Sequence, residues 1–181
     1  MRVIAGSGKG RLLKVPREVS RPTTDRVRES VFGILAPVIS GARVLDLFAG
    51  SGALGIEALS RGAESCTFVE QNRGAVGVID ENLRQLGFKE GKVVQREVAA
   101  FLKAERGEYD LIFADPPYPD GLSDPAGDLA ALEGWADWLK DDGYLILESE
   151  AMGEMLAPVG LEKVQQRDYG RSRIGIFRCA K

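Results

Sequence analysis

The run Asp115-Pro116-Pro117-Tyr118 combines residue types that could prepare an aromatic amine for reaction. The Asp115 carboxylate and the backbone carbonyl of Pro116 are two acceptors that could draw the hydrogens of a planar NH2 group out of conjugation. The two prolines fix their own φ and restrict the residue before each, which stiffens the loop. Tyr118 offers a flat face for a base, and such stacking is worth about 1–3 kcal/mol. The pattern fits an amino-methyltransferase loop, although taken alone it fits a proline-rich turn equally well.

The residues before this loop favour the functional interpretation. Residues 109–114 form a short, apolar, β-prone run that reads as a buried strand. The loop therefore follows the carboxyl end of a strand, which is where open α/β sheets bind their ligands.

A second motif precedes it in the chain. Residues 43–48 predict another strand, a glycine-rich loop follows at 49–55, and helix-forming residues continue to 61. Glycines let the backbone approach a ligand closely, and the helix N-terminus presents free N–H groups. Glu70 ends the next predicted strand, 18 residues after Gly52, where its carboxylate could accept both hydroxyls of a ribose. The candidate cofactor-binding residues are Asp46, Phe48, Ala49, Gly50, Ser51, Gly52, Glu70 and Gln71.

These glycines also satisfy the dinucleotide fingerprint G-x-G-x-x-G with an acid downstream, so an NAD-dependent oxidoreductase is a competing hypothesis. Asp46 favours S-adenosylmethionine (SAM), because a carboxylate at that place suits the ammonium end of a methionine moiety and would repel a pyrophosphate. The D-P-P-Y run also has no evident task in hydride transfer. We therefore expect SAM as the cofactor.

Taken together, the motifs resemble those of a known family, the RsmD-type 16S ribosomal RNA guanine-N2 methyltransferases. The resemblance covers nearly the whole chain and rests on residues 2–6, 10–11, 21–29, 45–55, 57–63 and 115–118. The D-P-P-Y run marks amino-methyltransferases broadly, whereas the block Arg-Pro-Thr-Thr-Asp-Arg-Val-Arg-Glu at 21–29 is far more specific. The resemblance implies methylation of N2 of the guanine at position 966 of bacterial 16S rRNA, either as free RNA or within an assembling 30S subunit.

Composition excludes several other classes. The chain has 181 residues, no histidine and two cysteines, which excludes a Ser-His or Cys-His hydrolase and leaves no basis for a metal site. No apolar stretch is long enough for a membrane span and no signal peptide is evident, so we expect a cytoplasmic protein. Cys66 reads as a structural thiol within a buried strand. A monomer is the expectation for the oligomeric state.

Charge is distributed unevenly along the chain. Residues 1–30 carry a net charge of +5 and the remainder carries −8, within a total of −3. A basic segment on an acidic body suggests directed binding to a phosphate backbone. A solvated charged arm is the alternative. The candidate RNA-binding residues are Arg2, Lys9, Arg11, Arg21, Arg26 and Arg28.

Strands and helices alternate after residue 43, which predicts an α/β fold with helices on both faces of a seven-stranded, mostly parallel sheet. We expect strands near 43–48, 65–70, 92–95, 109–114, 143–149, 160–167 and 173–179, and helices near 52–60, 72–86, 97–105, 126–139 and 151–157. The last two strands have only a short link, so the last strand should be antiparallel. This is the layout of the SAM-dependent Rossmann-like methyltransferases, and the resemblance implies it independently.

The predicted organisation is one methyltransferase domain, 1–181. Residues 1–40 would form an RNA-binding β-hairpin and helix extension, and residues 41–181 would form the SAM-binding catalytic core. Residues 120–127 could be a lid or a plain connector. Trp135 and Trp138 are expected in the core rather than in base stacking, and the tip at 169–172 is a weaker candidate for RNA contact.

Two further functional alternatives stay open at this point. A DNA adenine-N6 or cytosine-N4 methylase could use the same loop chemistry, although so short a chain offers no separate DNA-recognition domain. A non-catalytic RNA-binding module with a vestigial pocket would not need Asp46, Glu70 and Asp115 to be intact.

Overall fold

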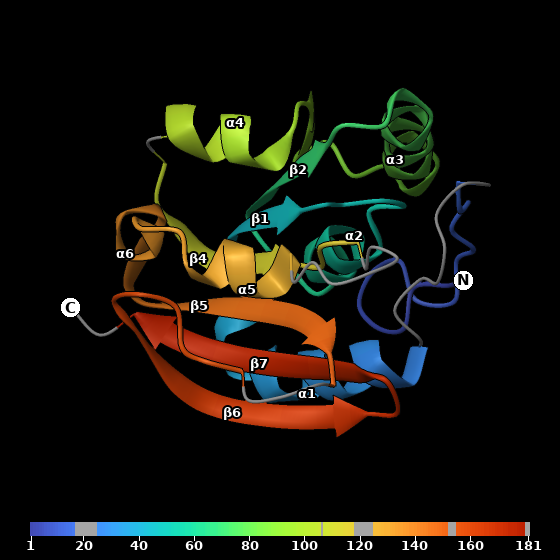
Figure 1. Ribbon diagram of the computed structural model, residues 1–181. Helices are drawn as coiled ribbons and strands as arrows, with labels where there is room; N and C mark the ends of the chain where they lie inside the picture. Colours follow the sequence, from blue (N-terminus) through green and yellow to red (C-terminus); the bar gives the residue numbers. More distant parts are fainter. Residues whose placement is uncertain (17–24, 106, 118–124, 152–154, 180–181) are drawn as a thin grey trace. The chain divides into compact units, whose positions relative to one another are not determined.

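The computed structural model describes residues 1–16, 25–105, 107–117, 125–151 and 155–179 (Figure 1). The chain divides into two compact units, Met1–Ala104 and Glu105–Lys181, and each is described in turn. Among the described residues, no helix is long and apolar enough to cross a membrane.

The first unit alternates helices and parallel strands. Its elements are α1 (Asp25–Ile39), β1 (Arg43–Leu47), α2 (Ala53–Ser60), β2 (Ser65–Glu70), α3 (Arg73–Leu86), β3 (Gly91–Gln95) and α4 (Val98–Ala104). β2 lies between β1 and β3 and is parallel to both. Four of the five β1 residues are buried, as expected for a parallel strand covered on both faces. These strands agree closely with the sequence prediction.

Local signals determine where α3 begins and ends. The Asn72 side chain accepts a hydrogen bond from the backbone N–H of Ala75 and caps the helix N-terminus. Gly87 ends the helix with φ 78°, a left-handed conformation that glycine adopts without steric cost. The apolar face between these caps buries Ala75, Ile79 and Leu83.

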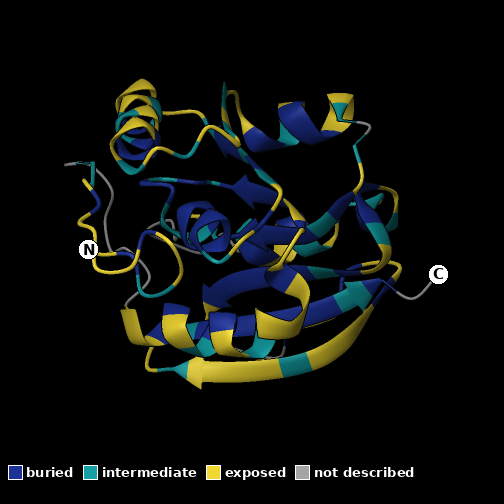
Figure 2. Cartoon of the chain, turned by 180° about the vertical axis from the view of Figure 1, so that it is seen from behind, coloured by how far each residue is buried: buried dark blue, intermediate teal, exposed yellow. Residues whose placement is uncertain are grey.

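The second unit is mostly sheet. Its elements are β4 (Tyr109–Ala114), α5 (Pro125–Ala130), α6 (Trp135–Trp138), β5 (Leu139–Glu150), β6 (Leu161–Tyr169) and β7 (Ser172–Cys179). β4 and β5 are parallel, while β7 is antiparallel to both of its neighbours, β5 and β6. β7 is largely buried and β6 is largely exposed, which Figure 2 shows as a yellow ribbon. The predicted antiparallel last strand is therefore confirmed.

The seven strands belong to one sheet with the order β3-β2-β1-β4-β5-β7-β6. The β1–β2, β2–β3 and β4–β5 pairs are parallel and β7 is antiparallel to β5 and β6, so the predicted mixed α/β sheet is confirmed.

Three predicted elements differ from the structure. The helix expected at 126–139 is two helices, because Gly134 adopts φ 101° and Leu139 is already extended. The helix expected at 151–157 does not form at residues 155–157, and residues 152–154 lie outside the described part of the chain.

The predicted N-terminal hairpin forms in part. Arg2 and Leu12 make a single antiparallel bridge, and backbone hydrogen bonds from Val3 to Arg11, from Gly10 to Val3 and from Leu13 to Met1 join the two arms. Backbone groups at residues 4, 5 and 14 bond to side chains of α2 and α3 instead of pairing across the turn. Contacts with the helices thus accompany a short stretch of pairing between the two arms.

The two tryptophans of the second unit were expected in the core rather than in base stacking. Trp135 is fully buried and Trp138 nearly so, and their rings meet edge to face with centroids 5.3 Å apart. The Trp135 indole N–H donates to the Leu129 carbonyl at 3.1 Å. Both tryptophans are core residues, as predicted, and Cys66 is buried as well.

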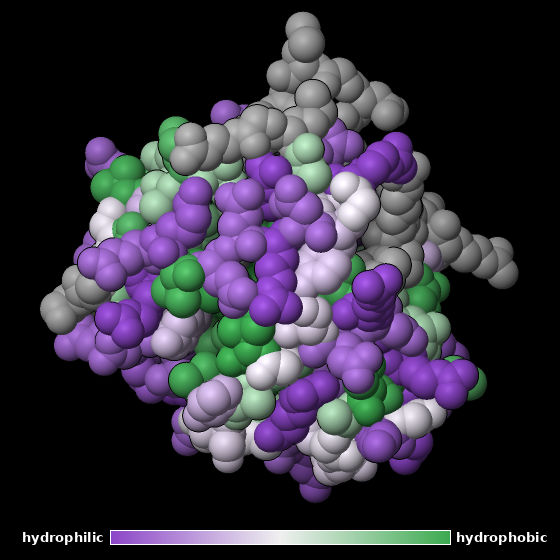
Figure 3. All heavy atoms as spheres, turned by 90° about the horizontal axis from the view of Figure 1, so that it is seen from below, coloured by the Kyte–Doolittle hydropathy of each residue, from purple (hydrophilic) through white to green (hydrophobic). Residues whose placement is uncertain are grey.

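Hydrophilic side chains cover most of the face seen in Figure 3, and hydrophobic groups on it are small and separate. Leu156, Val159 and Val164 are the large hydrophobic residues of the second unit that are exposed among those the structure describes.

Candidate active site

The glycine loop after β1 makes a sharp left-handed path. Phe48, Gly50 and Gly52 have φ values of 57°, 55° and 76°. The Gly52 N–H donates to the Ala49 carbonyl at 2.7 Å, which closes the turn before α2 begins. Left-handed φ is uncommon for a bulky residue such as phenylalanine, and such outliers cluster at functional sites. The loop therefore has the backbone of a ligand-binding turn.

Gly55 allows α2 to approach β2 closely. A Cβ atom built on Gly55 would lie 2.3 Å from a Phe68 ring carbon and 2.5 Å from the Cys66 sulfur. No side chain fits in that space, so the glycine is required for packing rather than for its φ angle. Through this contact, β2 fixes the position of the α2 N-terminus.

Asp46 connects β1 to the first turn of α2. Its side chain is buried, and Oδ2 accepts a hydrogen bond from the Gly55 N–H at 2.9 Å. Burial raises the pKa of Asp46 to about 7; the Gly55 hydrogen bond opposes this shift and the nearby negative charge of Glu70 adds to it. The carboxyl group is therefore poised to change charge near neutral pH.

Glu70 holds the other side of the glycine loop. One carboxylate oxygen accepts from the Gly50 N–H at 2.9 Å, and the other accepts from the Asn72 N–H at 2.8 Å. Asp46 and Glu70 thus stand on neighbouring parallel strands and each binds one backbone N–H of the 50–55 segment. The two carboxylates clamp the loop and make its surroundings negative.

The other candidate cofactor residues lie along the same turn. Ala49, Ser51 and Gly52 are buried, and Phe48 is half-buried. Gln71 is exposed, and its carbonyl accepts from the Gln95 amide at 3.5 Å. The structure therefore brings all eight candidates together at the carboxyl ends of β1 and β2.

The second motif follows β4 within the second unit. Asp115 is half-buried, Pro116 is buried and Pro117 is exposed, directly after the buried strand end at Ala114. Tyr118 and residues 119–124 lie outside the described residues, as does most of the segment considered as a lid. The described part of the motif occupies the predicted place, at the carboxyl end of a strand.

The N-terminal cations divide into exposed and buried ones. Arg2, Lys9, Arg11 and Arg26 are exposed, and Arg21 lies outside the described residues. The Arg11 guanidinium donates from Nη2 to the Gln85 carbonyl at 2.7 Å, near the end of α3. Its charge remains at the surface, where it is available to a phosphate.

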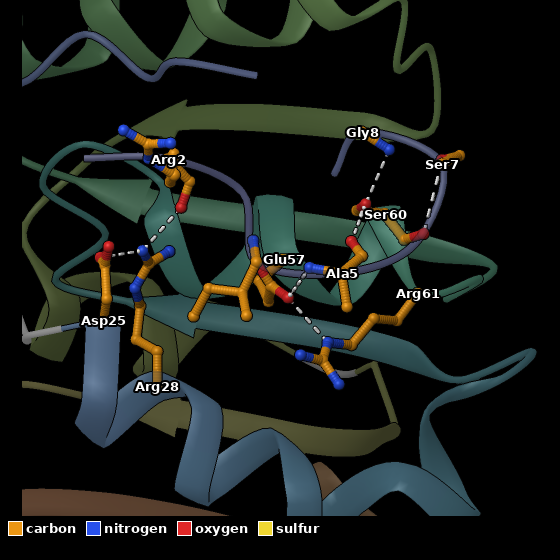
Figure 4. Close-up of polar contacts among 10 residues, drawn as sticks. Arg2, Ala5, Ser7, Gly8, Asp25, Arg28, Glu57, Ser60 and Arg61 are labelled. Atoms are coloured by element: carbon orange, nitrogen blue, oxygen red, sulfur yellow. Dashed lines mark hydrogen bonds and ion pairs between the residues drawn. The ribbon is translucent and has the colours of Figure 1, made fainter. Parts of the chain in front are cut away.

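Arg28 corrects the sequence expectation. Its side chain is fully buried, and Nη2 donates to the Arg2 carbonyl at 2.8 Å and to Asp25 Oδ1 at 2.7 Å (Figure 4). Among the residues that the structure describes, its Nε and Nη1 atoms have no hydrogen-bond partner. The first turn of α1 buries this side chain under the N-terminal segment, so Arg28 does not belong to an exposed RNA surface.

Sequence reasoning missed Glu57, a carboxylate that supports the N-terminal segment. It is fully buried in α2 and accepts from the Ile4 N–H at 2.8 Å, the Ala5 N–H at 3.0 Å and Arg61 Nε at 2.7 Å (Figure 4). The sequence did contain a signal, because Arg61 stands four residues after Glu57, a spacing that allows an ion pair on one helix face.

Ser60, one turn further along α2, completes this contact. Its hydroxyl donates to the Ala5 carbonyl and accepts from the Gly8 N–H at 2.9 Å, and its own carbonyl accepts from the Ser7 N–H at 2.8 Å. A Cβ atom on Gly6 would lie 1.7 Å from the Ser60 carbonyl oxygen. The turn at 6–10, which carries Lys9, is therefore seated directly on α2.

Asn82 is a second residue that the sequence did not reveal. It is fully buried in α3, and its Oδ1 accepts from the Lys14 N–H at 2.9 Å. Its Nδ2 donates to the Lys14 carbonyl at 3.0 Å and to the Ser51 carbonyl at 3.1 Å. One side chain thus contacts both the N-terminal segment and the glycine loop.

No group of three or more His, Cys, Asp or Glu side chains suited to a metal occurs in the part of the chain that the structure describes.

Comparison with known proteins gives consistent matches over this chain. The family model described as Conserved hypothetical protein 95 matches residues 1–178. Ribosomal RNA small subunit methyltransferase D of Escherichia coli (strain K12) is 42% identical over 83% of this chain and 75% of the relative. The protein of the same name from Haemophilus influenzae is 34% identical over 94% and 89%. A solved structure described as "Putative methyltransferase yhhF from Escherichia coli" has TM-score 0.86 and 37% identity, covering 99% and 98%.

Fold and loop geometry together define a methyltransferase of the Rossmann-like class. The resemblance to the RsmD-type enzymes is confirmed by these matches. The chain belongs to the family described as Conserved hypothetical protein 95.

Proposed function

We propose that this chain transfers a methyl group from SAM to the exocyclic N2 amine of a guanine in bacterial 16S ribosomal RNA, at position 966 by its family resemblance. The observation that carries the proposal is the glycine loop clamped between Asp46 and Glu70, in a chain that also places Asp115-Pro116-Pro117 after β4. Relatives named as small subunit rRNA methyltransferases support the choice of substrate.

The carboxylates of Asp46 and Glu70 on either side of the glycine loop suit SAM better than a dinucleotide. Two carboxylates beside the loop favour a ligand with a cationic end and ribose hydroxyls, whereas they would repel the pyrophosphate of NAD. Glu70 would accept hydrogen bonds from the ribose hydroxyls, and the exposed backbone of the loop would contact the adenosine. Asp46 would lie toward the ammonium group, where its negative form is favoured.

The chemistry assigned to this chain is positioning and electrostatics. SAM, when bound, supplies a methyl group on a cationic sulfur. The Asp115 carboxylate and the Pro116 carbonyl would accept the two N2 hydrogens of the guanine, which would free the nitrogen lone pair from conjugation with the ring. Asp46 and Glu70 would hold SAM, whose methyl group would pass to N2 with neutral S-adenosylhomocysteine as the leaving group. The nitrogen would then lose one proton, to Asp115 or to water. A carboxylate beside the amine stabilises the positive charge that develops there.

The RNA would be held by the exposed N-terminal cations, chiefly Lys9 and Arg11, with Arg2 and Arg26 as further candidates. A guanine in folded RNA must leave its stack to reach a loop of this kind. Contacts with the phosphates on both sides of the target guanine would hold the RNA strand while the base is turned out.

The test is methylation of 16S rRNA, both naked and in 30S particles, with tritiated SAM and mapping of the labelled nucleotide. We expect label on N2 of a single guanine, which is lost in Asp115→Ala while SAM affinity is largely kept. Asp141→Asn removes an exposed carboxylate of the same unit and should behave as wild type. Label on another atom or on DNA, or turnover of Asp115→Ala within tenfold of wild type, would overturn the proposal.

A further inference from the structure

A buried amide joins the basic N-terminal segment to the glycine loop. The hydrogen bonds that the Asn82 side chain makes with the described residues go to backbone atoms, two of them on Lys14 and one on Ser51. These partners stand 68 and 31 residues away in the sequence. Because the side chain is fully buried, no water replaces a bond that is lost.

Two basic side chains lie near this junction, Arg11 and Lys14, and Arg11 is one of the candidate RNA-binding residues. The Arg11 guanidinium donates to the Gln85 carbonyl, and the Lys14 ammonium pairs with Glu81, so both basic residues are tied to the same turn of α3 as Asn82. The Asn82 amide also donates to the carbonyl of Ser51, which is buried in the middle of the candidate cofactor loop. Movement of this loop therefore changes a hydrogen bond of the residue that fixes the Lys14 backbone.

We propose that Asn82 is a positioning residue that couples the cofactor loop to the RNA-binding segment, so that each ligand strengthens binding of the other. The proposal rests on the proposed function. A ligand that orders the 48–52 loop holds the Ser51 carbonyl, which holds the Asn82 amide and through it both backbone groups of Lys14. By thermodynamic reciprocity, RNA bound to the segment must tighten cofactor binding by the same factor.

The test measures RNA affinity with and without S-adenosylhomocysteine (SAH), a product that binds without reacting. For wild type we expect SAH to lower the dissociation constant of 16S rRNA at least about fivefold, the lower end of ordinary allosteric coupling. The Asn82→Asp side chain has the same shape and keeps the acceptor for the Lys14 N–H. Its second oxygen replaces the amide nitrogen, so it has no hydrogen to donate to the Lys14 and Ser51 carbonyls. In this variant the ratio of the two dissociation constants should fall to about one.

Gln85→Glu is the matched control. It makes the same amide-to-carboxylate change three residues later on α3, at an exposed side chain whose contact with Arg11 uses only the backbone carbonyl. It should keep the wild-type ratio, which separates the loss of the amide from the added negative charge. A purely structural role for Asn82 would weaken RNA binding equally with and without SAH and would leave the ratio unchanged.

A second measurement uses the wild-type protein alone and does not depend on a folded variant. Hydrogen exchange of the Lys14 amide should slow when SAH is added, whereas the Gly87 amide, which donates to the Arg84 carbonyl, should not change. RNA that binds wild type with no response to SAH, together with unchanged Lys14 exchange, overturns the coupling and leaves the proposed function intact. Failure of wild type to bind RNA at all overturns the proposed function, and the coupling with it.

Discussion

Asp46 on β1 and Gly55 on α2 are joined by a buried hydrogen bond of 2.9 Å from the glycine N–H to the aspartate carboxyl group. The bond connects the end of a central parallel strand to the first turn of the helix that follows the glycine loop. It places an acid of raised pKa directly under the loop that we assign to the cofactor.

The stability of the protein should depend on pH through Asp46. Because its pKa rises from an ordinary value of 3.8 to about 7 on folding, the folded state binds the proton more tightly than the unfolded chain. The associated stabilisation is fully present below about pH 4 and is lost as the pH rises to about 7, by on the order of 4 kcal/mol at most. Above that pH the contribution of Asp46 to the free energy of unfolding should not change further.

Urea denaturation of wild type and Asp46→Asn between pH 4 and pH 8 measures this effect. Asparagine keeps an acceptor for Gly55 but does not ionise, so the free energy of unfolding of wild type should fall relative to the variant across that window. Asp141→Asn, at an exposed carboxylate, should run parallel to wild type. Parallel curves for Asp46→Asn as well would show that this carboxyl group ionises normally.

Glu70→Gln should weaken SAM binding by about 2–3 kcal/mol, because a neutral amide makes weaker hydrogen bonds to hydroxyls and also places a donor toward the Gly50 or Asn72 N–H. Isothermal calorimetry with SAM and SAH gives the change directly. Glu90→Gln removes an exposed carboxylate elsewhere in the unit and serves as the control. Cofactor affinity equal to wild type in Glu70→Gln would remove Glu70 from the proposed pocket.

Replacing Lys9 and Arg11 together by alanine should raise the RNA dissociation constant and flatten its dependence on salt by up to about two units on a double-logarithmic plot. SAM affinity should stay the same. The control removes Lys89 and Lys92, two other exposed lysines of the first unit, which changes the net charge equally. Filter binding over a salt series checks both variants, and equal losses in the two would indicate a non-specific charge effect.

Gly55→Ala should destabilise the protein by about 1–3 kcal/mol, because the new methyl group would overlap the Phe68 ring and the Cys66 sulfur. Gly77→Ala on α3 is the matched comparison. Its Cβ meets nothing within 4 Å, so this variant should gain about 0.5–1 kcal/mol from helix propensity. Thermal unfolding of both variants measures the difference, and a stable Gly55→Ala would mean that α2 can shift away from β2.

The local pattern of the sequence predicted most of the strands and the loop that follows β1. Buried parallel strands are continuous apolar runs, and Asp46, Gly50, Gly52 and Glu70 lie within one strand–loop–helix–strand unit, so their spacing alone places them at one sheet edge. The helix predicted at 126–139 was wrong because the apolar pattern continues through a glycine whose left-handed φ interrupts the helix.

The support beneath the N-terminal segment was decided only by the tertiary structure. Glu57, Asn82 and Arg28 are polar residues on helices, and their sequence pattern is that of ordinary surface positions. Each becomes fully buried because residues 1–14 fold back over the helices and offer unpaired backbone groups. Those hydrogen bonds join residues between 26 and 68 positions apart. No local periodicity carries such information, since the need for a buried partner appears only when distant backbone groups lose their water.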